Sequence, residues 1–188
     1  MRVSISGSHS TGKSTLAEMC YNTLHRMYPG NVAIIREVAR EVAKEGYPIV
    51  KSVTHDSYYR GIFKQLNYER MTCGKFIICD RSMIDYLAYL KVNCNSNLFI
   101  QMVEEIVWLE SKYFDRYIFL PIEFNVIDDS VRDTDEVNRK AIEDEIIALF
   151  KYFNIKAIKV SGNFQERLNT LMSLFNVPGC ALDSSSLS

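Results

Sequence analysis

The sequence near the N-terminus reads Gly7-Ser8-His9-Ser10-Thr11-Gly12-Lys13-Ser14. This run fits the pattern G-x-x-x-x-G-K-[ST] at every fixed position. The residues before it, Val3–Ser6, are β-rich, and those after it carry apolar side chains at helical spacing: Leu16, Met19, Cys20, Leu24 and Met27. Because the pattern binds phosphate when it joins a strand to a helix, we interpret it as a phosphate-binding loop rather than a chance glycine turn.

The residue types in this loop suit a nucleotide and its metal ion. The glycines let the backbone wrap closely round a phosphate chain, and successive N–H groups and the helix N-terminus point at the anion. Lys13 supplies a mobile cation for the β and γ oxygens of ATP, and Ser14 supplies a ligand for Mg²⁺. His9 is interpreted as a permitted variable position. The predicted ATP site consists of Gly7, Ser8, His9, Ser10, Thr11, Gly12, Lys13, Ser14 and Thr15.

The composition indicates a single globular domain. The chain has 188 residues, of which 47% are hydrophobic and 24% are charged. Its net charge of −1 provides no overall positive field that would attract nucleic acid or acidic lipid. Binding of such a partner would need a local basic cleft. Five scattered cysteines, with no signal peptide and no apolar segment of membrane length, indicate free thiols in a cytoplasmic protein that does not enter a membrane.

Short β-rich runs alternate with longer segments of helical period, which predicts an α/β fold with a parallel sheet covered by helices on both faces. The predicted strands are Val3–Ser6, Val32–Ile35, Lys75–Asp80, Arg116–Leu120 and Ile155–Val160. Helices are expected after the loop, from about Thr54 to Met71, and at two later amphipathic segments. The first of these is expected to start with Asp133 and Glu136 in a capping-box-like arrangement, and the second with Asn163 and Glu166. We expect one domain over residues 1–178 and a frayed tail over 179–188.

Charged side chains follow two of the predicted strands. Asp80-Arg81-Ser82 ends the third strand, and Arg36-Glu37-Val38-Ala39-Arg40 follows the second. In open α/β folds ligands bind at this edge of the sheet. A carboxylate there can orient Mg²⁺ or accept the proton of a hydroxyl, and guanidinium groups can hold phosphate oxygens. A solvated helix start is the alternative interpretation for Arg36 and Arg40. Because no N/T-K-x-D motif follows any strand, a GTPase is disfavoured.

These elements resemble those of thymidylate kinases and deoxynucleoside kinases, where an acidic residue ends the second strand and an acidic residue with an arginine ends the third. The sequence is closer still to the ribosylnicotinamide kinase domain of bifunctional adenylyltransferases, and to the AAA-domain ATPases grouped with it. Their R-E-x-A-R-E segment is matched by residues 36–41, and their D-D-G-x-R segment by Asp128–Arg132, with Ser130 in place of the glycine. The resemblance covers residues 3 to about 168.

The resemblance implies a five-stranded parallel sheet of the nucleotide-kinase type, with a lid. The polar stretch from Glu123 to Asp135 has no helical or strand period, so we predict that it is this lid. Arg132 and Arg139 would then stabilise charge on the transferred phosphoryl group. Lys13 would hold the donor, and Ser14 and Asp80 would hold the metal. Glu37 would contact the acceptor hydroxyl or ribose.

Acceptor recognition is expected between Tyr47 and Arg70, with Arg40 and Arg81 on an acceptor phosphate where there is one. Tyr58, Tyr59 and Phe63 could stack on a base, and Gln65 could hydrogen-bond its edge, as a glutamine does in related nucleoside kinases. The alternative is an ordinary buried stripe formed by Tyr59, Ile62, Phe63 and Leu66.

The sequence thus predicts an ATP- and Mg²⁺-dependent kinase acting on a nucleoside, a nucleoside monophosphate or a similar small acceptor. A second hypothesis places the acceptor nucleotide within DNA or RNA, and a basic stripe of Arg60, Lys64 and Arg70 would favour it. A third is a slow ATPase that acts as a switch with a protein partner. A homodimer is left open.

Overall fold

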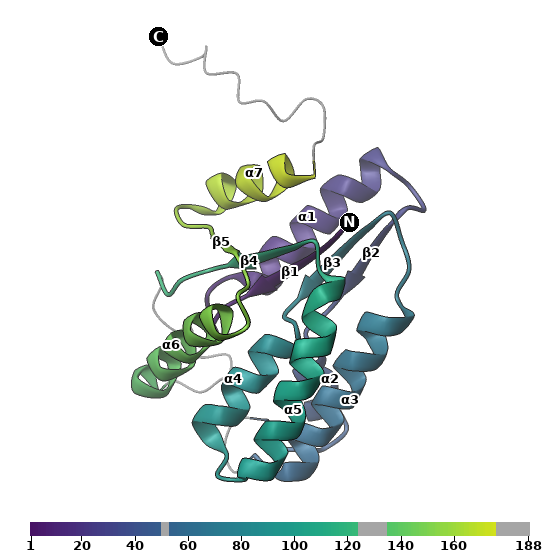
Figure 1. The fold of residues 1–188 in the computed structure, drawn as a ribbon. Helices are drawn as coiled ribbons and strands as arrows, with labels where there is room; N and C mark the ends of the chain where they lie inside the picture. The colour runs from purple at the N-terminus through teal and green to yellow at the C-terminus, as the bar shows by residue number, and fades with distance from the viewer. Residues whose placement is uncertain (50–52, 124–134, 176–188) are drawn as a thin grey trace.

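The computed structural model describes residues 1–49, 53–123 and 135–175. Within these residues the chain forms five strands and seven α-helices (Figure 1). In chain order the elements are β1 (Arg2–Ser6), α1 (Lys13–Met27), β2 (Val32–Ile35), α2 (Val38–Lys44), α3 (His55–Met71), β3 (Phe76–Asp80), α4 (Met83–Asn93), α5 (Asn97–Glu110), a 3₁₀ turn (Ser111–Tyr113), β4 (Arg116–Phe119), α6 (Glu136–Tyr152), β5 (Ala157–Lys159) and α7 (Phe164–Leu174).

The strands form one sheet in the order β2-β3-β1-β4-β5, and all neighbouring strands are parallel. The predicted five-stranded parallel sheet is therefore confirmed. Val3 of the central strand β1 pairs with Ile78 of β3 on one side and with Arg116 of β4 on the other. The chain thus crosses to opposite sides of β1, so the loop that follows β1 lies where ligands bind in such sheets.

Two hydrophobic cores lie on opposite faces of the sheet, because successive side chains of a strand alternate between its faces. In β4 and the residue after it, Ile118 and Leu120 pack in the core with α1 and α7. Tyr117 and Phe119 pack in the core with helices α2 to α6. Figure 1 shows α1 and α7 above the sheet and the other helices below it. This is the predicted arrangement with helices on both faces.

Capping residues were predicted for two helices, α6 and α7, and the prediction for α6 was wrong. Asn163 and Glu166 form the predicted capping box at α7, each side chain accepting from the other residue's backbone N–H. At α6 the cap is Asp135, whose side chain accepts from the N–H groups of Val137 and Asn138. Asp133 lies outside the described residues, as do Arg132, most of the predicted lid and the predicted tail.

The sequence did not locate helices α2, α4 and α5. Trp108, on α5, is 52% exposed, and the ammonium group of Lys112 lies 3.4 Å from the centre of its ring. Cys20, Cys73, Cys79 and Cys94 are free thiols. Among the helices that the structure describes, none is long and apolar enough to span a membrane.

Candidate active site

The phosphate-binding loop runs from the end of β1 to the start of α1, as its sequence predicts. Three of its residues have positive φ: Gly7 at 151°, Ser10 at 57° and Gly12 at 87°. A Cβ atom on Gly7 would lie 2.5 Å from the backbone oxygen of Leu120, so a side chain at this position would push the loop away from the end of β4. Alternating backbone conformations of this kind turn successive N–H groups towards one concave side.

Lys13 lies under this loop and is almost fully buried. Its Nζ donates hydrogen bonds to the backbone oxygen of Ser8 and to Oγ1 of Thr11, the latter at 3.2 Å. Burial, followed by the positive charge of Arg81, lowers the pKa of Lys13 to about 7. The protein alone therefore stabilises the ammonium form poorly, and an anion bound by the loop would favour it.

Asp80 ends β3 beside the loop and is 2% exposed. Burial, and then the negative charge of Glu37, raise the pKa of its carboxyl group. One carboxylate oxygen interacts with the hydroxyl group of Ser14. The other, Oδ1, is buried and has no hydrogen-bond partner among the described residues. A carboxylate and a hydroxyl at the phosphate loop are the protein ligands that Mg²⁺ takes beside a nucleotide, so these two residues fit the predicted metal.

Glu37 and Arg81 form a buried ion pair next to the loop. Nε and Nη2 of Arg81 donate to Oε1 of Glu37 at 3.1 and 2.9 Å. The other carboxylate oxygen accepts from Nε of Arg40 at 3.0 Å. Arg81 has a φ of 82°, which is uncommon for a residue with a side chain. In this conformation its Nη1 reaches the backbone oxygen of Gly7 at 3.5 Å, so the pair connects the end of β2 with the loop.

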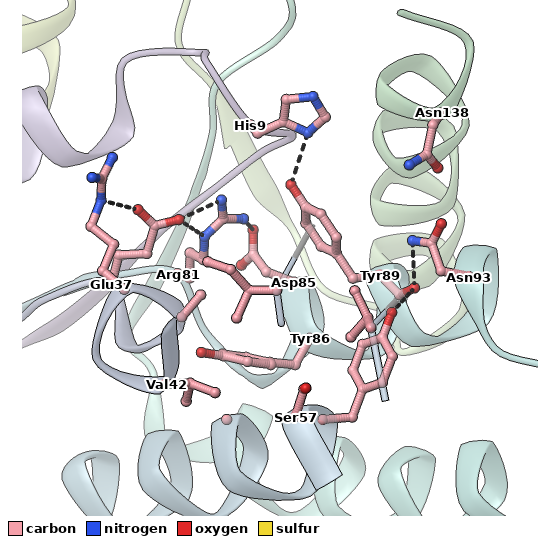
Figure 2. Close-up of a pocket in the computed structure, with 16 residues that line it drawn as sticks. His9, Glu37, Val42, Ser57, Arg81, Asp85, Tyr86, Tyr89, Asn93 and Asn138 are labelled. Atoms are coloured by element: carbon pink, nitrogen blue, oxygen red, sulfur yellow. Dashed lines mark hydrogen bonds and ion pairs between the residues drawn. The ribbon is translucent and has the colours of Figure 1, made fainter. Parts of the chain in front are cut away.

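A cavity of about 350 Å³ opens on the other side of this ion pair (Figure 2). Its polar end contains Glu37, Arg81 and Asp85, while Tyr58 and Tyr86 form part of its apolar wall. The remaining lining residues are His9, Ala39, Arg40, Val42, Ile49, Val53, Ser57, Gly61, Tyr89, Asn93 and Asn138. Arg81 also lines a small hollow over the loop, together with residues 10–15. Arg81 therefore borders both spaces.

A family model described as an AAA domain matches residues 2–167, which is most of the chain. The chain belongs to this AAA-domain family. Comparison with curated proteins returns no match.

Several solved structures have a fold similar to that of this AAA-domain protein. A NadR protein in complex with NAD and AMP-PNP has a TM-score of 0.69 at 19% identity over 94% of this chain, and NadR in complex with NR has 0.71 at 21% over 93%. This chain spans about half the length of those two proteins. A thymidylate kinase from Ehrlichia chaffeensis has a TM-score of 0.65 at 15% identity over 93% of this chain. A deoxyadenosine kinase from M. mycoides has a TM-score of 0.64 at 17% identity over 94% of this chain. Both of these proteins are matched over 98% of their own lengths. The chain therefore has the fold of the P-loop nucleoside and nucleotide kinases.

Most of the predicted site residues of the AAA-domain protein come together at one edge of the sheet. Lys13 and Ser14 line the hollow over the loop, and Asp80 interacts with the hydroxyl group of Ser14. Glu37, Arg40 and Arg81 line the neighbouring cavity. This arrangement follows from the parallel sheet, because the carboxyl ends of β1, β2 and β3 lie side by side.

The predicted acceptor contacts on α3 are only partly supported. Tyr58 lines the cavity, but Tyr59 and Phe63 are exposed, so they neither stack in the cavity nor belong to the buried stripe. Gln65 is fully buried and is not part of the cavity lining. Its Nε2 donates to Glu69 at 2.8 Å, while its Oε1 is buried and has no hydrogen-bond partner among the described residues.

Arg139, which was predicted to stabilise charge on the transferred phosphoryl group, packs against the loop from α6. It is 1% exposed and donates to the backbone oxygens of His9 and Ser10 at 3.1 and 3.3 Å. Its guanidinium group thus contacts carbonyl groups of the loop. A direct role for Arg139 in phosphoryl transfer stays a prediction.

The sequence interpretation missed three residues that shape the site. Asp85 accepts from the N–H of Gly7 at 3.0 Å and caps α4 together with Ser82. Tyr89 carries the hydroxyl group that contacts His9 at 3.2 Å. Arg167 donates to the backbone oxygen of Thr11 at 2.8 Å. The S-x-x-D pattern of Ser82 and Asp85 could have indicated the capping box. No local pattern indicates a contact between residues 11 and 167.

The basic stripe that would favour nucleic acid is neutralised by acidic neighbours. Lys64 lies 2.8 Å from Glu45, and Arg60 lies 3.9 Å from the same side chain. Arg70 forms an ion pair with Glu110. These three residues therefore provide no uncompensated positive track towards the site.

Proposed function

We propose that the protein transfers the γ-phosphoryl group of ATP, with Mg²⁺, to a hydroxyl group of a small nucleoside-like acceptor. The observation that carries this proposal is the position of Arg81, which borders both the hollow over the phosphate loop and the 350 Å³ cavity. A donor in the first space and an acceptor in the second would meet at this side chain. Such proximity is the main requirement of phosphoryl transfer.

The donor side of the proposed reaction uses the loop and the end of β3. The loop N–H groups and Lys13 would hold the triphosphate, and Ser14 and Asp80 would hold Mg²⁺. The metal would neutralise charge on the β and γ oxygens. In support, the orphan Oδ1 of Asp80 leaves one oxygen available for a cation.

The acceptor side favours an uncharged hydroxyl over a second phosphate. Arg40 and Arg81 both already contact the carboxylate of Glu37. An acceptor phosphate would have to displace this carboxylate or lie against it, and like charges repel strongly in a buried site. A hydroxyl group could instead donate to Glu37, which would orient it and accept its proton. Tyr58 and Tyr86 provide apolar surface for a ring.

Two of the similar structures agree with this acceptor class, while the thymidylate kinase is named for a nucleoside monophosphate. The deoxyadenosine kinase is described with the products dCMP and dCDP, and one NadR structure holds NR. These are statements about those proteins, and at 17–21% identity they support only the fold here. The charges around the cavity are the independent argument for a nucleoside-like acceptor.

A transfer assay with labelled ATP across nucleosides, nucleoside monophosphates, nicotinamide riboside and oligonucleotides tests the proposal. We expect a nucleoside to be labelled with the highest kcat/KM. The variant Gly61→Ala should then raise the acceptor KM, because a Cβ at position 61 would lie 2.7 Å from Cε1 of Tyr86 and force the ring or α3 to move. The ATP-analogue affinity should stay unchanged.

Three results would contradict the proposal. Labelling of oligonucleotides alone would support a nucleic-acid kinase, and ATP hydrolysis that no acceptor accelerates would support the switch hypothesis. An unchanged acceptor KM in the Gly61→Ala variant would place the acceptor outside the cavity.

Binding of an ATP analogue is expected to take up a proton at about pH 8. Burial lowers the pKa of Lys13 to about 7 in the protein without a nucleotide, so the side chain is mostly neutral at that pH. Phosphate oxygens stabilise the ammonium form and raise this pKa, so the complex binds a proton that the free protein lacks. Calorimetry in buffers of different ionisation enthalpy measures the uptake. In the Lys13→Arg variant the guanidinium is always protonated, and the uptake should disappear. Equal uptake by both proteins would assign the proton to another group.

A further inference from the structure

The carbonyl groups of four successive loop residues each accept a hydrogen bond. The backbone oxygen of Ser8 accepts from Lys13 and, at 3.0 Å, from Oγ1 of Thr11. The next two oxygens, of His9 and Ser10, accept from Nε and Nη2 of Arg139 at 3.1 and 3.3 Å. The fourth, of Thr11, accepts from Nη1 of Arg167 at 2.8 Å. Three of the four carbonyl groups are thus held by two arginines far away in the chain.

Both arginines are themselves fixed on the side away from the loop. Arg139 and Arg167 are 1% and 2% exposed. Nη1 of Arg139 contacts Glu136 at 3.1 Å, and Nη2 of Arg167 contacts Glu123 at 2.5 Å. Nε of Arg167 also donates to the backbone oxygen of Gly162 at 2.9 Å. Each guanidinium group therefore joins a carboxylate of the surrounding structure to the backbone of the loop.

The peptide group makes this contact relevant to phosphate binding. In a trans peptide the C=O of one residue and the N–H of the next point in opposite directions. Fixing the carbonyl groups of residues 8–11 on one side therefore fixes the N–H groups of residues 9–12 on the other. A guanidinium charge at the oxygen also polarises the peptide group, which makes its N–H end a stronger donor.

We propose that Arg139 and Arg167 are positioning residues that orient the loop N–H groups for a triphosphate. They act through the backbone and do not touch the phosphate. Binding of the phosphate chain by the loop is the one part of the proposed function on which this inference rests. The loop motif ends at residue 14, so α6 and α7 supply a part of the anion site that the motif does not contain.

The experiment measures the affinity for inorganic tripolyphosphate and for a non-hydrolysable ATP analogue by calorimetry. In the Arg167→Gln variant we expect both affinities to fall about tenfold or more, because small misplacements of binding groups are costly. Arg167→Lys should keep part of the affinity, since an ammonium group can still donate to the carbonyl of Thr11. Arg139→Lys should behave similarly at His9 and Ser10. The acceptor KM should not change.

Arg70→Gln is the matched control. It also removes a guanidinium group that pairs with a buried carboxylate, but this carboxylate belongs to Glu110, away from the loop. It should lower Tm and leave both affinities unchanged when measured below the Tm of every variant. Parental affinity in both Arg167 variants, or an equal loss of affinity in Arg70→Gln, would overturn the inference. So would a parent protein that does not bind tripolyphosphate. Tripolyphosphate binding that depends on Arg167, without any phosphoryl transfer, would support the inference and contradict the proposed function.

Discussion

Replacing Lys13 by alanine is expected to reduce phosphoryl transfer about a thousandfold, which corresponds to roughly 4 kcal/mol of transition-state stabilisation. Lys13 is buried under the loop, and its Nζ donates to two loop atoms, the carbonyl oxygen of Ser8 and the hydroxyl oxygen of Thr11. It is therefore placed to follow the charge on the β and γ oxygens during transfer. Single-turnover assays with labelled ATP measure the effect.

Lys64→Ala is the control for this substitution. Lys64 is also a lysine near carboxylates, but it pairs with Glu45 on the surface, so its removal should leave the rate unchanged. A Lys13→Ala variant that transfers phosphate at the parent rate would show that the loop is not the donor site.

The two strand-end carboxylates are expected to respond differently to loss of charge. Asp80→Asn keeps the shape of the side chain but removes the anionic oxygen that would face Mg²⁺. We expect transfer to fall about a hundredfold and its magnesium dependence to weaken. Glu37→Gln should lower kcat, because an amide cannot accept the proton of the acceptor hydroxyl, and it should leave ATP-analogue affinity nearly unchanged.

Rates as a function of magnesium concentration, together with analogue affinities, distinguish the two roles. The Glu37→Gln variant also loses a charged partner of Arg81, so its Tm is measured first, and kinetics are compared below the lower Tm. Loss of analogue affinity in the Glu37 variant together with normal magnesium dependence in the Asp80 variant would reverse the assignment.

The sheet could be predicted from the sequence because each strand is short, β-rich and bounded by polar residues. The predicted strand Val32–Ile35 coincides with β2, and the predicted strand Val3–Ser6 lies within β1, which starts at Arg2. Helices α4 and α5 are harder to locate from periodicity. In α4 nearly every residue of the first two turns is buried, so polar and apolar positions do not alternate at helical period. In α5, Leu98, Trp108 and Leu109 are apolar but exposed, which blurs the apolar stripe.

The candidate site was predictable where a residue lies at the end of a strand or in the loop motif that follows one. Asp80 ends β3, Glu37 lies just after β2, and Lys13 belongs to the loop motif after β1, so that parallel pairing brings the three to one edge. Side chains within helices were less predictable, because their direction depends on how the helix packs. The sequence did not predict that Gln65 donates to Glu69 or that Arg139 contacts the loop backbone.

Under the proposed function, the sheet separates a donor half of the protein from an acceptor half. The loop continues into α1, and α7 supplies Arg167, so the core on that face of the sheet supports the nucleotide side. The cavity is formed largely by α2, α3 and α4, whose apolar side chains belong to the core on the opposite face. Substitutions that reshape one core are separated from the other core by the sheet. Acceptor preference could therefore diverge within this architecture while ATP binding is retained. Two residues would limit this divergence: Arg81, which borders both spaces, and Arg139, which reaches the loop from α6.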